Sequence, residues 1–402
     1  MAYGLIGERL GHSFSPMLHS MLGAYDYRLY PLTPQELPGF LENNALQGFN
    51  VTIPYKQAVM PYLTGISERA AAIGSVNTVI RRQDGSLYGD NTDCYGFEQL
   101  LGDASSFTGQ KALVLGSGGA SKTVQKVLTD QGIIPVVISR GGENHYGNLD
   151  RHRDAALLVN TTSVGMYPQV DASPLSLTGF DRLTLVLDLI YNPHRTRLLL
   201  DAEALGIPCR GGLLMLAAQA QEAARLWGQR DDTDITPMMA EEILKGTMNI
   251  ALIGMPGCGK SKVANELARL GGRQVLDTDD LVQTMQGAHP RDIIEQEGEA
   301  AFREKETLAL AEAAKQSGVI IATGGGIVTV PENLPLLRQN SRVLWIQRDL
   351  ALLASRGRPL SQAMGVEELY ARRQPLYKEW AEGTYHNRDW RDTARQIQED
   401  WL

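Results

Sequence analysis

Eight residues in the last two fifths of the chain, GMPGCGKS at 254–261, have the types and the spacing of a phosphate-binding loop. They follow the apolar run NIALI and precede a stretch with helical spacing. Glycines allow backbone N–H groups to close around phosphate oxygens, and the start of the helix adds a partial positive charge. Lys260 is expected to bridge the β and γ phosphates, and the Ser261 hydroxyl to bind Mg²⁺. The pattern therefore predicts a site for a nucleoside triphosphate.

A second glycine-rich segment, GSGGAS at 116–121, follows the apolar run ALVLG and opens another helical stretch. The pyrophosphate of a dinucleotide could rest on that helix N-terminus, although a tight strand–helix turn also needs glycine for packing alone. The end of the next strand is more informative, because a NAD site usually has Asp or Glu there for the ribose 2′-hydroxyl. This chain has Ser139 and Arg140 instead. An arginine favours a 2′-phosphate, so the segment predicts NADP(H).

Composition narrows the function classes. At 402 residues the chain exceeds what one hydrophobic core usually supports, so two or three domains are expected. The formal net charge of −8, with acidic and basic residues interspersed, argues against nucleic acid as a partner. No apolar run is long enough to span a membrane. Cys94, Cys209 and Cys258 lack metal-ligand spacing, and we interpret them as free thiols of a cytoplasmic protein.

Alternating strand-like and helical stretches predict an α/β fold in three domains. We expect an α/β domain at 1–102, a doubly wound, Rossmann-like domain at 103–212, and helices at 213–245 after it. The apolar run at 155–162 is typical of a buried parallel strand in that second domain.

The third domain is expected at 248–402, with the phosphate loop on a parallel sheet in three α/β/α layers. A helix capped by Thr236 precedes it, and residues 245–247 form the junction. This junction is too short to act as a flexible tether.

Four further motifs accompany the phosphate loop, and with it they resemble shikimate kinase over essentially all of 249–402. They are DTDD at 277–280, GEAAFREKE at 298–306, GGG at 324–326 and RRQPLY at 372–377, together with a lid-like RGRPL at 356–360. No motif is specific alone, but their order with a phosphate loop is. The resemblance implies a P-loop kinase that transfers the ATP γ-phosphoryl group to shikimate with Mg²⁺.

The resemblance to the kinase implies roles for the charged residues. Asp277 would hold Mg²⁺ through water, and Asp279 would contact the acceptor hydroxyls and take a proton. Arg303 and Arg373 would bind the substrate carboxylate, and Arg358 would stabilise the transferring phosphoryl group. The other implied residues are Gly325 against the substrate, Glu306 as a brace for Arg303, and Gly257, Cys258, Gly259, Lys260, Ser261 and Lys262 around the nucleotide. The chain departs from the family at Lys262, where Thr is more common, and in a lid that is shorter than is common. Because of the shorter lid, the resemblance assigns no role to Arg356 and no nucleotide preference.

Six motifs in the first 245 residues resemble those of shikimate dehydrogenase. They are GHSFSPMLH at 11–19, NVTIPYK at 50–56, NTV at 77–79 with GDNTD at 89–93, NTTSVGM at 160–166, DLIYNPHRTRLL at 188–199 and GLLMLAAQA at 212–220. Together and in this order they leave little room for chance. The resemblance implies reduction of 3-dehydroshikimate to shikimate with NADPH. It also implies that residues 1–102 form the substrate-binding domain, which the helices at 213–245 complete.

The resemblance to the dehydrogenase implies that Lys56 and Asp93 flank the reacting carbon, with Lys56 as acid and base. Ser13 and Ser15 would bind the substrate carboxylate as neutral donors. The other implied contacts are Thr52, Asn77 and Gln219 with the hydroxyls, Tyr191 near the substrate, Gly212 and Met215 beside the nicotinamide, Asn160 and Thr161 toward the cofactor, and Gly116, Gly118, Gly119, Ala120, Ser121, Ser139 and Arg140 on NADP.

Some residues of these motifs fit the family pattern less well. Gly141 and Gly142 stand where a Thr commonly helps to grip the 2′-phosphate, so the grip depends largely on the one arginine before them. Met215 fits core packing as well as it fits a cofactor contact. His12 and His19 flank the serine motif and receive no role.

The two sites imply two reactions in sequence, because the product of the first is the substrate of the second. Two alternatives stay open: one half could be a ligand sensor without turnover, or the phosphate loop could serve a switch ATPase that acts on a protein partner. The presence of Lys56, Asp93, Lys260, Ser261 and Asp279 favours two active enzymes.

Overall fold

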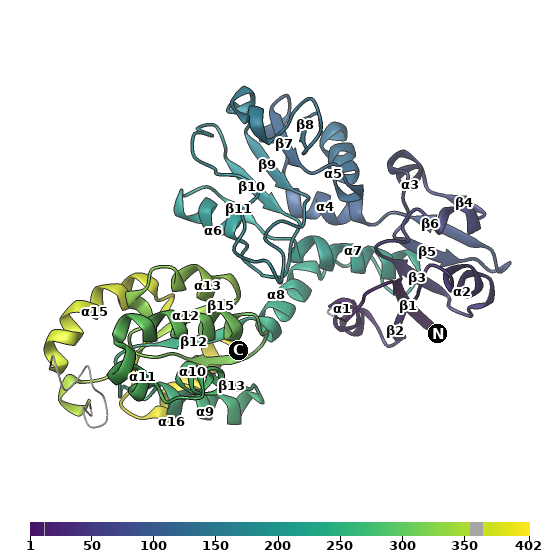
Figure 1. The fold of residues 1–402 in the computed structure, drawn as a ribbon. Coiled ribbons are helices and arrows are strands. Elements are labelled where there is room, and N and C mark those ends of the chain that lie inside the picture. The colour runs from purple at the N-terminus through teal and green to yellow at the C-terminus, as the bar shows by residue number, and fades with distance from the viewer. Residues whose placement is uncertain (12, 354–364) are drawn as a thin grey trace. The chain divides into compact units, whose positions relative to one another are not determined.

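Three separate β-sheets organise the chain, and each is accompanied by helices (Figure 1). The computed structural model describes residues 1–11, 13–353 and 365–402. Contacts group the chain into two compact units. The N-terminal unit comprises Met1–Met166, Ala172–Tyr191 and Asp201–Ile243, and the C-terminal unit comprises Tyr167–Asp171, Asn192–Leu200 and Leu244–Leu402.

The first sheet of the N-terminal unit has six strands with mixed pairing, in the order β2-β1-β3-β5-β6-β4. Its strands are β1 (Ala2–Gly7), β2 (Asp26–Pro31), β3 (Gly48–Val51), β4 (Gly65–Ile66), β5 (Thr78–Arg81) and β6 (Leu87–Asp90). β5 and β6 pair antiparallel across a turn that contains Asp84 and Gly85, and the positive φ of Gly85, 84°, suits such a turn. The hairpin brings the chain to Asp90, three residues before Asp93.

The helices beside the first sheet begin and end at residues that suit helix termini. α3 (Glu68–Ile73) is capped by Ser67, whose Oγ accepts a hydrogen bond from the Ala70 N–H at 3.2 Å. It ends at Gly74, which adopts the left-handed conformation with φ 73°. The other helical segments are α1 (Ser15–Leu22), α2 (Leu37–Asn43), the 3-10 turn η1 (Met60–Tyr62), α7 (Leu213–Leu226) and α8 (Thr236–Thr247).

The second sheet of the N-terminal unit has five parallel strands in the order β11-β10-β9-β7-β8. They are β7 (Lys111–Leu115), β8 (Ile134–Ile138), β9 (Leu157–Asn160), β10 (Leu185–Asp188) and β11 (Cys209–Arg210). The helical segments around them are α4 (Asp93–Leu101), η2 (Ser105–Phe107), α5 (Gly119–Asp130), η3 (Tyr146–His152) and α6 (Arg197–Ala204). Every residue of β9 and β10 is buried, which explains their continuous apolar sequence. The expected Rossmann-like α/β class is confirmed.

The sheet of the C-terminal unit is also parallel and five-stranded, in the order β13-β14-β12-β15-β16. Its strands are β12 (Asn249–Ile253), β13 (Val275–Asp277), β14 (Ile320–Ala322), β15 (Ser341–Gln347) and β16 (Gly383–His386). The helical segments are α9 (Lys260–Gly271), α10 (Thr278–Gln286), α11 (Pro290–Glu297), α12 (Glu299–Ala314), η4 (Ile327–Thr329), α13 (Asn333–Asn340), η5 (Leu350–Leu352), α15 (Val366–Trp380) and α16 (Trp390–Trp401). Figure 1 shows α12 and α13 on one side of the sheet and α9 and α16 on the other, so the expected α/β/α layering is confirmed.

Helix α8 leads directly into the third sheet, because it ends at Thr247 and β12 begins at Asn249. The junction expected at 245–247 is therefore the last turn of a helix. Gly246 does not end α8, since a glycine near a helix end costs only about 1 kcal/mol relative to alanine.

Residues 192–200 follow the second sheet in sequence but belong to the C-terminal unit. Arg195 accounts for this, because its guanidinium pairs with Glu382 at 2.8 Å and donates to the carbonyl of Ser341 at 2.9 Å. The backbone N–H of His194 also donates to Oδ1 of Asn340 at 3.0 Å. The segment is thus bonded to residues at the starts of β15 and β16.

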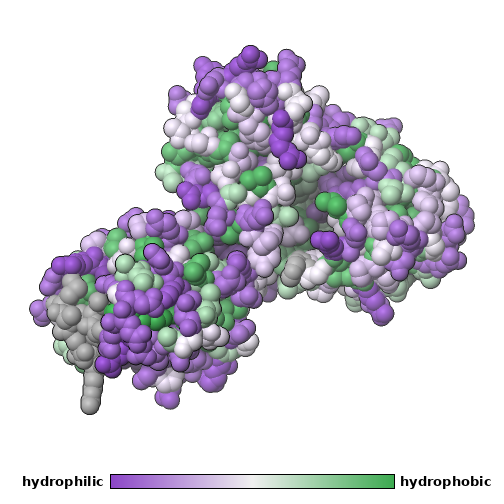
Figure 2. All heavy atoms as spheres, viewed as in Figure 1, coloured by the Kyte–Doolittle hydropathy of each residue, from purple (hydrophilic) through white to green (hydrophobic). Residues whose placement is uncertain are grey.

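The last feature of the fold is the distribution of hydrophobic residues on the visible surface and in the helices. Figure 2 shows hydrophilic side chains over much of the visible face, with hydrophobic ones scattered between them. Within the described ranges no helix combines the length and the apolar character that a membrane crossing requires.

Candidate active sites

The phosphate loop connects β12 to α9, as its spacing predicts. Gly254, Gly257 and Gly259 have positive φ angles of 141°, 83° and 103°, a region that side chains disfavour. A Cβ at Gly254 would also collide with the carbonyl of Ile346. Lys260 is buried, and its Nζ donates a hydrogen bond to the carbonyl of Gly254 at 2.8 Å. The ammonium group is therefore held within the loop that would surround phosphate oxygens.

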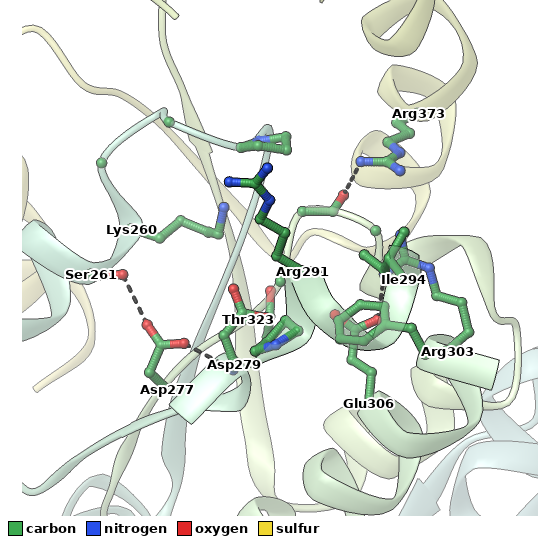
Figure 3. Close-up of a pocket in the computed structure, with 18 of the residues that line it drawn as sticks. Lys260, Ser261, Asp277, Asp279, Arg291, Ile294, Arg303, Glu306, Thr323 and Arg373 are labelled. Carbon is green, nitrogen blue, oxygen red and sulfur yellow. Dashed lines mark hydrogen bonds and ion pairs between the residues drawn. The ribbon is translucent and has the colours of Figure 1, made fainter. Parts of the chain in front are cut away.

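A cavity of about 520 Å³ lies beside the phosphate loop (Figure 3). The residues predicted for the kinase site that line it are Gly257, Gly259, Lys260, Ser261, Lys262, Asp277, Asp279, Arg303, Glu306, Gly325 and Arg373. Cys258 is fully buried, and its carbonyl accepts a hydrogen bond from Nδ2 of Asn387 at 2.6 Å. Arg356 and Arg358 lie outside the described residues. The structure thus gathers residues from distant motifs around one cavity.

The cavity has further lining residues that the sequence analysis missed. They are Pro256, His289, Pro290, Arg291, Ile294, Phe302, Thr323 and Arg348. Gly324 and Gly326 also line the cavity, and both belong to the GGG motif at 324–326. One signal was available for Arg348, which directly follows β15, because α/β sheets bind ligands at the carboxyl ends of their strands. The residues of α11 lie outside every quoted motif, so no sequence pattern indicated them.

Ser261 and Asp277 form an oxygen pair at the edge of the cavity. The Ser261 hydroxyl donates to Oδ2 of Asp277 at 2.9 Å, and Oδ1 of Asp277 accepts the backbone N–H of Asp279 at 3.0 Å (Figure 3). Mg²⁺ prefers oxygen ligands and usually keeps several waters, so two protein oxygens fit this ion. No group of three His, Cys, Asp or Glu side chains that could hold a metal occurs in the part of the chain that the structure describes.

Asp279 is a candidate proton acceptor by its surroundings. Burial raises the pKa of its carboxyl group, and the charge of Asp277 raises it further. Lys260 and Arg303 act in the opposite direction. A carboxylate with a raised pKa is a stronger base than an exposed aspartate.

Arg303 is fixed by two carboxylates of its own helix, α12. Its guanidinium contacts Glu306 at 2.6 Å and Glu299 at 2.9 Å. Burial alone would lower the pKa of Arg303, but the charge and the hydrogen bond of Glu306 raise it overall. Glu306 is fully buried, and burial raises its pKa, while Arg303 opposes that shift. The expected brace of Glu306 on Arg303 is present.

The three glycines at 324–326 leave room for this pair and for the phosphate loop. A Cβ at Gly324 would collide with Oε1 of Glu306, and one at Gly326 with the guanidinium of Arg303. A Cβ at Gly325 would lie 2.5 Å from Cδ of Pro256.

Arg373 is the second buried arginine of the cavity. It donates to the carbonyl of Gly325 at 3.0 Å (Figure 3). The same carbonyl oxygen also accepts the Tyr377 hydroxyl at 2.5 Å. Burial lowers the pKa of Arg373 below its usual value, although an arginine stays charged.

The N-terminal unit places Lys56 and Asp93 in direct contact. Nζ of Lys56 donates to Oδ2 of Asp93 at 2.6 Å, and Nδ2 of Asn77 donates to Oδ1 at 2.8 Å. The same amide group lies 3.4 Å from Oε1 of Gln219 on α7. A lysine, a carboxylate and two amides from four separate segments of the sequence thus form one hydrogen-bonded group.

The hydroxyl residues predicted for substrate lie on other elements of this unit. Oγ of Ser13 donates to Oγ of Ser15 at 3.1 Å, at the start of α1. The ring of Tyr191 lies 5.6 Å from that of Phe14, between the two serines in sequence. Thr52 follows β3, and its backbone N–H donates to the carbonyl of Ile6 at 2.9 Å. His12 lies outside the described residues.

The predicted dinucleotide loop connects β7 to α5. Gly116 has φ 104°, Gly118 precedes the helix, and Gly119, Ala120 and Ser121 form its first turn. Arg140 is exposed at the end of β8, next to Ser139. A helix N-terminus and an exposed arginine after the neighbouring strand suit a 2′-phosphorylated dinucleotide.

Other residues predicted near the cofactor make internal contacts. Asn160 donates to Asp188 at 3.0 Å, and the Thr161 hydroxyl donates to the carbonyl of Leu115 at 2.6 Å. Met215 is buried in the hydrophobic core of the unit. A Cβ at Gly212 would collide with the carbonyl of Leu189, so this position needs glycine for backbone packing.

Comparison with known proteins assigns both parts of the chain. The family model of the shikimate dehydrogenase substrate-binding domain matches residues 5–79, and that of shikimate kinase matches residues 256–400. A curated NADP(+) shikimate dehydrogenase of Clostridium beijerinckii is 38% identical over 248 residues, which are 56% of this chain and 91% of that protein.

Solved structures agree with this assignment of the N-terminal part. A chorismate mutase/shikimate 5-dehydrogenase fusion protein of Clostridium acetobutylicum has 33% identity and a TM-score of 0.56, over 60% of this chain and 96% of that one. Shikimate 5-dehydrogenase of Thermus thermophilus, solved with NADP(H) and shikimate, has 34% identity and a TM-score of 0.53, over 60% and 97%. The chain belongs to the shikimate dehydrogenase family and carries a shikimate kinase domain at its C-terminal side, so it is a bifunctional enzyme of the shikimate pathway.

Proposed function

We propose that the chain reduces 3-dehydroshikimate to shikimate with NADPH and then phosphorylates the shikimate 3-hydroxyl with ATP. The observation that carries the proposal is the presence of both reactive groups: the Lys56–Asp93 pair at 2.6 Å, and the Ser261–Asp277 pair at 2.9 Å beside Lys260. The family matches of both parts support the same reading.

In the dehydrogenase reaction, NADPH supplies the hydride when it is bound. Lys56 donates a proton to the ring oxygen as the ketone becomes an alcohol, and Asp93 orients the ammonium group through the 2.6 Å contact. Asn77 holds the other oxygen of Asp93 and, with Gln219 and Thr52, faces the substrate hydroxyls.

The remaining polar residues of this half bind the two ligands. Ser13 and Ser15 donate to the substrate carboxylate with Tyr191 beside them. The start of α5 holds the cofactor pyrophosphate, and Arg140 with Ser139 holds its 2′-phosphate.

In the kinase reaction, Arg303 and Arg373 bind the shikimate carboxylate, and Asp279 accepts the proton of the attacking hydroxyl. Lys260 and the N–H groups of the loop hold the ATP phosphates. Ser261 and Asp277 would hold Mg²⁺, which neutralises charge on the phosphates when it is bound. The proposal places Arg358 over the transferring group.

The proposed reactions need three domains: substrate binding at 1–102 with 213–245, NADP binding at 103–212, and the kinase at 248–402. Cys94, Cys209 and Cys258 all lie in the described part of the chain, and no disulfide links any of them there. Cysteines without disulfides and the use of NADPH and ATP are typical of a cytoplasmic enzyme, and we propose that location for this protein.

Two single substitutions in the full chain test the assignment. Lys56→Met should lower shikimate-dependent NADP⁺ reduction by about 10² to 10⁴-fold, the usual contribution of a general acid or base, and leave ADP formation unchanged. Lys260→Met should abolish shikimate-dependent ADP formation and leave the dehydrogenase unchanged. A chain in which one activity is absent before substitution would instead have a binding module in that half. ATP hydrolysis without shikimate would indicate a switch ATPase.

A further inference from the structure

Arg69 joins three distant elements of the N-terminal unit with one guanidinium group. From α3, its Nε donates to Oδ1 of Asp90 at 2.6 Å and its NH2 group to Oδ2 at 2.9 Å, so the pair is bidentate. The same NH2 group donates to Oε1 of Glu222 on α7 at 3.1 Å. Asp90 is the last residue of β6. Segments that lie more than 120 residues apart in sequence are thus tied at one point.

Each of the two carboxylates stands close to a predicted substrate residue. Glu222 lies three residues after Gln219, one helical turn along α7. Asp90 lies three residues before Asp93, and Oδ1 of Asp90 accepts the backbone N–H of Asn91 at 2.7 Å. Oδ1 of Asn91 in turn accepts the N–H of Asp93 at 3.1 Å. The position of Asp93 therefore follows from the position of Asp90.

The contacts close into a ring, because Asn77 bonds to Asp93 at 2.8 Å and lies 3.4 Å from Gln219. The other side of the ring is Arg69 between Asp90 and Glu222. Substrate would meet the ring at Asn77, Asp93 and Gln219, whereas the described hydrogen bonds of Arg69 go to Asp90 and Glu222.

Charge explains why this position needs an arginine. Glu222 is 2% exposed and Asp90 is 6% exposed. Two buried carboxylates without a cation between them would be expensive to desolvate and would repel each other. A forked guanidinium can bond to both at once, which a lysine cannot do with the same geometry. Ser67, the cap of α3, adds a hydrogen bond to Asp90 at 2.5 Å.

Glu222 has a second arginine partner that provides a matched control. Arg225 contacts Oε2 of Glu222 at 2.7 Å and Oε1 at 3.0 Å. Arg225 lies three residues from Glu222 on the same helix, so this pair ties no second element to α7. Arg225 and Arg69 thus neutralise the same carboxylate, but Arg69 alone of the two also reaches Asp90 in the described contacts.

We propose that Arg69 is a positioning residue of the dehydrogenase site, which sets the distance between Gln219 on α7 and Asp93 after β6. The inference rests on the proposed dehydrogenase function. Arg69 would thus affect the binding of shikimate and the contact between Lys56 and Asp93 without touching the substrate.

The test compares Arg69→Met, Arg69→Lys and Arg225→Met in the full chain by NADP⁺ reduction with shikimate. Arg69→Met should raise the KM for shikimate and lower kcat, each by about fivefold or more, since small misplacements of catalytic groups have large effects. The KM for NADP⁺ should change less than twofold. The pH profile of kcat should shift because the Lys56–Asp93 contact changes. Arg69→Lys should restore part of the loss, and Arg225→Met should alter all constants less than twofold.

Several outcomes would overturn the inference. One is an Arg69→Met chain with a lower unfolding temperature but with the parent KM for shikimate, kcat and pH profile, which would make Arg69 a purely structural residue. Another is an equal effect of Arg225→Met, which would point to the charge of Glu222 alone. If Arg69→Met does not fold, Arg69→Lys against Arg225→Met decides the question. Absence of shikimate oxidation in the parent chain would instead contradict the proposed function.

Discussion

The two candidate active sites differ in how much charge they contain. In the dehydrogenase site, Lys56 and Asp93 form one ion pair among amides and hydroxyls. In the kinase site, the described residues that line one cavity include two lysines, four arginines and three carboxylates. Hydride transfer to a ketone needs one proton at one oxygen, whereas phosphoryl transfer spreads charge over several oxygens. The difference in charge therefore follows the difference in chemistry.

The residues proposed to bind the shikimate carboxylate differ between the two sites in the same way, neutral in one and charged in the other. The dehydrogenase would use the neutral hydroxyls of Ser13 and Ser15, and the kinase the guanidinium groups of Arg303 and Arg373. A buried charge depends on its partner, as Glu306 depends on Arg303, and a neutral donor does not. We therefore expect the kinase site to be the more sensitive of the two to loss of one residue and to salt.

Among the changes that test how the two sites bind the carboxylate, Arg303→Met in the kinase has the largest expected effect. The change removes a proposed hydrogen-bond donor to the substrate carboxylate. It also leaves the buried carboxylate of Glu306 without its 2.6 Å contact to Arg303. Truncating one partner of a buried, hydrogen-bonded charge pair costs about 2 to 5 kcal/mol of binding free energy, so kcat/KM for shikimate should fall at least about 30-fold in an ADP-release assay. Arg372→Met is the matched control, because the exposed Arg372 pairs only with Glu368 among the described contacts. Equal effects of the two changes would contradict a charge-based grip.

The second prediction concerns His19, a buried side chain of the N-terminal unit that stays uncharged in the folded protein at neutral pH. His19 on α1 stacks on Tyr27 with ring centres 3.8 Å apart, and burial lowers its pKa from 6.5 to about 3. The folded unit therefore resists protonation, and the stability that neutral His19 contributes is lost as the pH falls from 6.5 toward 3. Between pH 7 and pH 5 the loss is about 2 kcal/mol.

His19→Phe keeps a ring against Tyr27 but cannot be protonated. Its free energy of unfolding should fall less steeply between pH 7 and pH 5 than that of the parent chain, as urea titrations followed by fluorescence would show. Identical pH slopes would mean that His19 titrates normally in the folded unit.

The sequence predicted the elements better than the contacts between them. Strand β10 and helix α7 could be recognised, because a continuous apolar run and a helical period are local features. The hydrogen bonds of Arg195 with the starts of β15 and β16 could not, since they join residues more than 140 positions apart. Nor did any local pattern reveal that Arg69 reaches Glu222.

The candidate sites divide in the same way. Motifs indicated Lys260, Asp277 and Arg303, whose spacing relative to glycines is distinctive. Arg291 of α11 lines the same cavity, but only the packing of that helix beside α12 reveals it. An arginine near the surface has no pattern that separates it from the solvated ones.

A moderate effect is expected from Ser13→Ala on the dehydrogenase. A hydrogen bond to a charged group contributes about 1.5 to 3 kcal/mol, so the KM for shikimate should rise about tenfold or more at saturating NADP⁺. Ser20→Ala is a suitable control, because its exposed hydroxyl bonds to the carbonyl of Met17 within α1. ADP formation should stay constant in both variants. An unchanged KM for shikimate in Ser13→Ala would refute the proposal that Ser13 binds the substrate carboxylate.

The smallest expected effect is the response of the parent chain to salt, and it compares both sites in one preparation. Raising the NaCl concentration from about 0.05 to 0.5 M shortens the screening length from roughly 14 to 4 Å. Attraction between the shikimate carboxylate and Arg303 or Arg373 should weaken, so the KM for shikimate in the kinase assay should rise about threefold at saturating MgATP. In the dehydrogenase assay at saturating NADP⁺ the same KM should change less, because hydroxyl groups carry no charge to screen. Equal salt responses would show that both halves attract the carboxylate through charge, and the contrast between the two grips would then be wrong.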